Sequence, residues 1–74
     1  MSKLKNTVES VKNNLAQANI NIPVIDNIDS DNATPNNLET ILNALNTAKA
    51  EYTEEEALYA IGRAIDDIDS LPQL

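Results

Sequence analysis

The most regular pattern of hydrophobic and polar residues runs through the first 22 residues. Apolar residues recur there at alternating steps of three and four: Met1, Leu4, Val8, Val11, Leu15, Ala18 and Ile22. Nearly all positions between them are polar, so the apolar stripe is as narrow as the seam of a coiled coil. We predict an amphipathic, coiled-coil-like helix over residues 1–19. Its self-association seam is Leu4, Val8, Val11, Leu15 and Ala18. The alternative is an ordinary amphipathic helix that packs on the rest of the domain.

A polar connector is predicted to follow this helix. Pro23 disfavours helical geometry at Ile22, the residue before it. The stretch from Asn27 to Asn37 is rich in Asp, Asn, Ser, Thr and Pro, residues that favour turns over regular elements. We therefore predict an extended linker over residues 20–34.

A helical hairpin is predicted over residues 35–71. Thr34 is a suitable N-cap and Pro35 suits the first helical turn, where its missing N–H is not needed. Thr53 and Glu56 have the spacing of a capping box, which predicts a second helix start and a break just before it. One continuous helix is the alternative. The apolar residues predicted to pack the hairpin are Leu38, Ile41, Leu45, Leu58, Ile61, Ile65 and Ile68.

These segments predict an all-α fold in a single small domain. A chain of 74 residues buries only about 60 % of the surface that its unfolded form exposes. The chain has no Phe and no Trp, and we expect Tyr52 and Tyr59 to be its only bulky core residues. This thin supply of large apolar side chains predicts that a partner chain completes the burial.

Charge is distributed unevenly along the chain, whose net charge is −7. Residues 38–70 carry eight acidic residues against Lys49 and Arg63, a balance of −6. Such a field repels nucleic-acid phosphate and anionic membranes, so we expect neither as a partner. A basic protein surface is the expected counterpart. The acidic partner face is predicted to consist of Glu51, Glu54, Glu55, Asp66, Asp67 and Asp69.

The last three of these acids raise a question about the end of the final helix. Negative charge at a helix C-terminus is unfavourable by a few tenths to about 1 kcal/mol for each residue. We therefore expect either a helix that already frays at Asp66 or a basic neighbour there, supplied by Lys3, Lys5 or Lys12 of the same chain or of a sister chain.

Candidate chemistry is scarce. The chain has no Cys, no His and a single Gly, so thiolate sites, imidazole bases and Gly-rich phosphate loops are excluded. Asn27, Asp29 and Asp31 begin like a calcium-binding EF-hand loop, but its twelfth position, where a bidentate Glu is required, is Leu38. We therefore predict no metal site, no cofactor and no catalytic residues.

The expected function follows by elimination. We expect a non-catalytic, acidic protein-interaction or assembly module that self-associates or joins a larger complex, such as a minor component or assembly factor of a phage virion. The alternative is an acidic inhibitor of the immunity, anti-defence or antitoxin type that binds a basic protein. Without a signal-peptide pattern or a long apolar run, the expected location is the cytoplasm or a virion assembled there.

Overall fold

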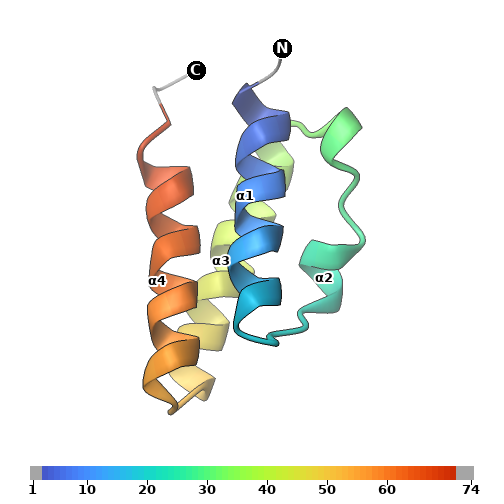
Figure 1. The fold of residues 1–74 in the computed structure, drawn as a ribbon. Coiled ribbons are helices and arrows are strands. Elements are labelled where there is room, and N and C mark those ends of the chain that lie inside the picture. Colours follow the sequence, from blue (N-terminus) through green and yellow to red (C-terminus); the bar gives the residue numbers. More distant parts are fainter. Residues whose placement is uncertain (1–2, 72–74) are drawn as a thin grey trace.

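The chain forms a small helical bundle in a computed structural model, which describes residues 3–71 (Figure 1). Its elements in order are α1 (Lys3–Gln17), α2 (Pro23–Asp26), the 3-10 turn η1 (Ser30–Asn32), α3 (Pro35–Glu51) and α4 (Glu55–Asp69). The predicted all-α class is confirmed, with no strand among the described residues. α1 packs most extensively against α4, α3 also packs on α4, α2 lies against α3 and η1 against α1.

A single hydrophobic core lies between these helices. Every helix except η1 contributes buried members, and Ile20 contributes one from the segment between α1 and α2. The buried residues are Val8, Val11, Leu15, Ile20, Ile25, Leu38, Ile41, Leu45, Ala48, Ala57, Ala60, Ile61 and Ala64. Ile41, Leu45 and Ile61 have no exposed surface. The core is therefore built from aliphatic side chains, and one chain supplies all of it.

The seam of α1 takes part in this core. Val8 and Val11 are fully buried and Leu15 is 3 % exposed, while Leu4 and Ala18 are partly buried against the same cluster. A self-association seam would leave these side chains available to another copy, whereas the alternative, an ordinary amphipathic helix, would pack them on the rest of the domain. The structure places them on the side of α1 that packs in the chain's own core, so a second chain cannot reach the three buried ones.

α1 ends in a Schellman motif. Asn19 has a left-handed backbone, with φ of 59°. Its N–H donates to the carbonyl of Ala16, and the N–H of Ile20 donates to that of Leu15. Ile20 is buried in the same core as Leu15, which is the apolar contact typical of this motif. The chain direction therefore reverses just after α1.

The connector is more ordered than the predicted extended linker. It contains α2, whose Pro23 occupies the first turn while Ile22 before it is extended, as its position predicts. It also contributes the fully buried Ile25 to the core. Asp29 caps η1 by accepting a hydrogen bond from the N–H of Asp31. The apolar Ile25 of this stretch therefore packs in the core, and the acidic Asp29 caps the short turn η1.

α3 and α4 are separated by a short break. Thr34 caps α3 in a capping box with Asn37, as its position predicts. Tyr52 is extended after α3, and α4 begins with Glu54 as its N-cap, without a side-chain hydrogen bond. The predicted capping box of Thr53 and Glu56 is therefore wrong, because the helix starts one residue later. Within residues 3–71, no helix is both long and apolar enough to cross a membrane.

Candidate functional site

The acidic residues predicted to form one partner face lie at the two ends of α4. Glu51, Glu54 and Glu55 lie at the turn between α3 and α4, and all are exposed. Asp66, Asp67 and Asp69 lie in the last turn of α4. Asp66 lies eleven positions after Glu55 on the helix, or about 16 Å along the axis. The six acids are therefore two groups.

Asp67 belongs to the interface between α1 and α4. It is partly buried, and its Oδ2 accepts hydrogen bonds from Ser10 Oγ and Asn14 Nδ2, each 2.8 Å long. These two donors stabilise the carboxylate at the end of α4, a role that we expected a lysine of α1 to have. Lys5 instead pairs with Asp31 at 2.9 Å, and Lys12 donates to the carbonyl of Ile28. Two lysines of α1 therefore bind residues of the connector, and Asp67 of α4 binds α1 through neutral polar side chains.

Exposed residues follow one another along the outer side of α4. Glu55, Tyr59, Arg63 and Asp66 occur at steps of four, four and three, and each is exposed. At 100° per residue these spacings place them within one narrow face of the helix. We call these four residues the α4 outer stripe. It includes two of the predicted acidic residues and places an aromatic ring between them.

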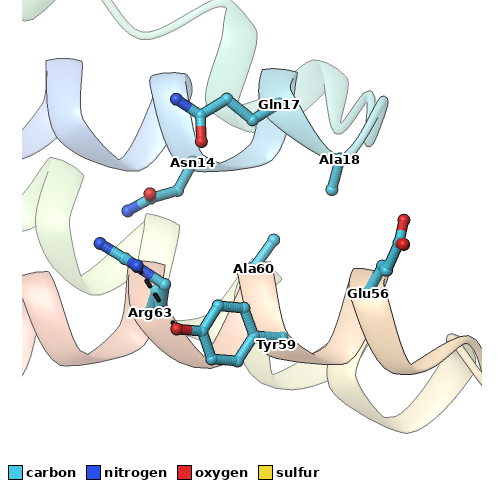
Figure 2. A pocket seen from close by; sticks show the side chains of 7 residues that line it. All are labelled: Asn14, Gln17, Ala18, Glu56, Tyr59, Ala60 and Arg63. Atoms are coloured by element: carbon cyan, nitrogen blue, oxygen red, sulfur yellow. Dashed lines mark hydrogen bonds between the residues drawn. The ribbon is translucent and has the colours of Figure 1, made fainter.

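Tyr59 is the most exposed large apolar side chain in the described part of the protein, at 68 %. We expected it to fill the core, and that prediction is wrong. The guanidinium carbon of Arg63 lies 5.7 Å from its ring centroid, and Arg63 Nη1 donates a 3.4 Å hydrogen bond to its hydroxyl (Figure 2). Arg63 therefore orients the ring along the surface of α4.

A hollow of about 180 Å³ opens beside this ring, between α1 and α4. Ala18, just after α1, and Ala60 of α4 point toward each other across it (Figure 2). Small side chains at both facing positions leave the space unfilled. Its remaining lining comes from Asn14, Gln17, Glu56, Tyr59 and Arg63. The hollow therefore has an apolar floor with charged and amide groups around it.

The seven residues predicted to pack the hairpin differ in how deeply the structure buries them. Leu38, Ile41, Leu45 and Ile61 are buried in the core. Ile65 and Ile68 are partly buried and pack against it. Leu58 is only partly buried. Each of the three lies on α4, so the outer part of that helix carries more accessible apolar surface than we expected.

Tyr59 and Arg63 are the site residues that sequence reasoning missed. Tyr and Arg are enriched among the residues that dominate protein interfaces, and their spacing of four on a predicted helix was a usable signal. Among residues 3–71, no group of three acidic residues is arranged to hold a metal ion. Comparisons of this chain with protein-family models, with curated proteins and with solved structures found no match.

Proposed function

We propose that this chain is a non-catalytic protein-interaction module, and that the α4 outer stripe is its contact surface. The observation that carries the proposal is the position of Tyr59, 68 % exposed and oriented by Arg63 in the middle of that stripe. Burying an aromatic side chain of this size against a partner is worth roughly 1.5–3 kcal/mol. A Tyr brings this apolar area at a small entropic cost, because it has few rotatable bonds.

The surroundings of the ring support the same use. Arg63 is exposed and so are the flanking acids Glu55 and Asp66, which gives an aromatic centre with charged groups around it. Interfaces commonly combine a buried aromatic or Arg anchor with a polar rim. The stripe therefore offers an anchor and a means of fixing the partner's orientation.

An assembly role is part of this proposal. The contact surface proposed for it is on α4, and not on the seam of α1. Val8, Val11 and Leu15 are covered within one chain, so pairing through the seam would require α1 to leave the core. A contact through α4 requires no unfolding. A small module of this kind suits a minor component or assembly factor of a larger particle, including a virion.

Site-specific photo-crosslinking in the native host tests the proposal. A benzoylphenylalanine at position 59 should crosslink to a defined protein, since that position would be buried in the complex. The same probe in place of Lys49, which is exposed on α3, is the matched control and should yield little product. Equal crosslinking from both positions, or none from either, would contradict the proposal.

An acidic inhibitor of a basic protein is the second candidate. Glu51, Glu54, Glu55 and Glu56 are all exposed around the turn between α3 and α4, and none forms an ion pair with another residue of the described 3–71 range. Their uncompensated charge favours a basic partner, with binding that weakens as salt rises. Charge reversal at Glu51 and Glu54, outside the stripe, should abolish capture of such a partner. Unchanged capture by that double variant would exclude this candidate.

A further inference from the structure

We infer that the partner of the α4 outer stripe is a second copy of this chain, bound with the two α4 helices antiparallel and the two-fold axis at Tyr59. This inference rests on the proposed function, because it names the partner of the same surface. Three features of α4 carry it: the order of its charges, the accessibility of the charged groups, and a glycine in the middle of the helix.

The order of charges is self-complementary. Glu55 lies four residues before Tyr59 and Arg63 lies four residues after it. In an antiparallel pair with its axis at residue 59, position 55 of each copy faces position 63 of the other. Glu55 of one copy then meets Arg63 of its partner twice, and the two Tyr59 rings meet at the axis. A two-fold interface requires this kind of self-complementary surface.

The dimensions suit such a pair. Four helical residues span about 6 Å along the axis, and packed helices lie about 8–10 Å apart. The long side chains of Glu and Arg reach across that distance, and Arg binds carboxylates through two parallel hydrogen bonds. Stacked or edge-to-face tyrosines fit the same separation. One pairing therefore satisfies charge and aromatic contacts together.

The charged groups are available for this contact. Glu55 and Arg63 are both exposed, and neither forms an ion pair with any other residue of the described part of the chain. The ring contact and the hydrogen bond of Arg63 are both with Tyr59, which belongs to the same stripe. The pairing would therefore break no intramolecular ion pair among these residues.

Gly62 gives an independent indication of a close neighbour. It lies in the middle of α4, where a glycine destabilises a helix relative to alanine. A Cβ built on Gly62 meets nothing within 4 Å, so packing within the chain does not require the missing side chain. Gly62 borders the stripe, since it lies three residues after Tyr59 and seven after Glu55 on the helix. A helix from a second copy would give the glycine a packing role that this chain alone does not.

The expected dimer is weak. One helix from each copy buries less area than the roughly 1,200 Å² of a stable specific interface, and each copy carries a net charge of −7. We therefore expect a dissociation constant on the order of 100 μM. Such an affinity suits an assembly in which many contacts act together.

Charge exchange at the two positions provides the test. Sedimentation equilibrium would be measured for the wild type, Glu55→Lys, Arg63→Glu and the double variant, up to millimolar concentration. Each single variant places like charges opposite each other and should weaken the dimer at least about tenfold. The double variant restores both pairs in reversed order and should return to within about threefold of the wild type. Glu39→Lys, an exposed site on α3, is the matched control and should dimerise like the wild type.

The alternative of an overall charge effect predicts a different result. Glu55→Lys reduces the net charge from −7 to −5, and Arg63→Glu increases it to −9. If net charge governed association, the first would strengthen the dimer and the second weaken it. A wild type that stays monomeric at every concentration, or a double variant that stays as weak as the single variants, would overturn the inference. A monomeric wild type that still crosslinks to another protein from position 59 would overturn it while leaving the proposed function standing.

Discussion

Asn14 of α1 donates a 2.8 Å hydrogen bond to Oδ2 of Asp67 near the end of α4. The same oxygen accepts a second bond from Ser10, so two polar residues of α1 hold one carboxylate on the neighbouring helix. This contact explains how an acidic residue is tolerated at a helix C-terminus. It also fixes α1 on α4 in the register that buries the seam.

Removal of the Asp67 carboxylate should loosen α1. Hydrogen bonds to a charged acceptor contribute about 1.5–3 kcal/mol, and relief of the unfavourable helix-dipole interaction returns a part of this. We expect Asp67→Ala to lower the free energy of unfolding by about 1–2 kcal/mol in urea denaturation. Asp69→Ala, at an exposed position in the same turn, should change it by less than about 0.5 kcal/mol. Equal effects of the two variants would contradict the role of Asp67.

At Asn19, the left-handed residue after α1, a substitution by glycine should not destabilise the fold, in contrast to the removal of Asp67. Asn19 has φ of 59°, a conformation that glycine adopts with less strain. Asn19→Gly should leave stability unchanged or raise it by up to about 1 kcal/mol, whereas Asn19→Val should lower it by about 1–2 kcal/mol. The control is Asn13→Gly in the middle of α1, which should be destabilising. Thermal unfolding followed by circular dichroism would show both signs, and a loss of stability in Asn19→Gly would contradict the motif.

The two threonines that precede helices should differ in effect. Thr34 accepts a 3.2 Å hydrogen bond from the N–H of Asn37, while Thr53 is not the N-cap of α4. Thr34→Ala should therefore lower the free energy of unfolding by about 1 kcal/mol. Thr53→Ala should have little effect, because no cap is lost. Chemical denaturation of the two variants side by side decides this, and a larger loss at Thr53 would show that α4 starts elsewhere in solution.

The Lys5–Asp31 pair predicts a small dependence of stability on alkaline pH. The hydrogen bond with Asp31, and then its charge, raise the pKa of Lys5 above its ordinary value of 10.5. A raised folded-state pKa stabilises the fold fully below the unfolded value and loses this contribution as pH rises through the folded value. The effect should be small, since both side chains are exposed. The difference in urea midpoint between the wild type and Lys5→Gln should be constant from neutral pH to about pH 9 and shrink above about 10.5. A difference that grew in that range would contradict the pair.

Local signals predicted several helix boundaries well. Pro23 kept Ile22 extended, and Thr34 with Pro35 marked the start of α3. Each of these features depends on residues within one helical turn, so a single sequence contains the necessary information. Thr53 was misassigned because a Thr and a Glu at that spacing are common, and nothing nearby distinguishes an N-cap from the residue before it.

The use of the seam could not be predicted from local pattern. An apolar stripe of two positions in seven resembles that of a coiled coil. In α1 a stripe this narrow is enough for packing in the chain's own core, because polar contacts on either side of the stripe also attach the helix. Ser10 and Asn14 reach Asp67 across 57 and 53 residues of sequence. Lys5 holds Asp31 in the connector. Such long-range pairs leave no periodic signal, and neither does the exposure of Tyr59, which depends on which side of α4 faces α1 and α3.

Amide hydrogen exchange of the dilute, monomeric protein tests most directly whether one chain completes its own core and so leaves α4 as the contact surface. Val8, Val11 and Leu15 of α1 lie in the same buried cluster as Ile41 and Ile61. We predict that the amides of these five residues exchange together in the slowest class, through global unfolding. Rapid exchange along α1, with α3 and α4 protected, would contradict this prediction. It would indicate that the seam of α1 is accessible for pairing with another chain.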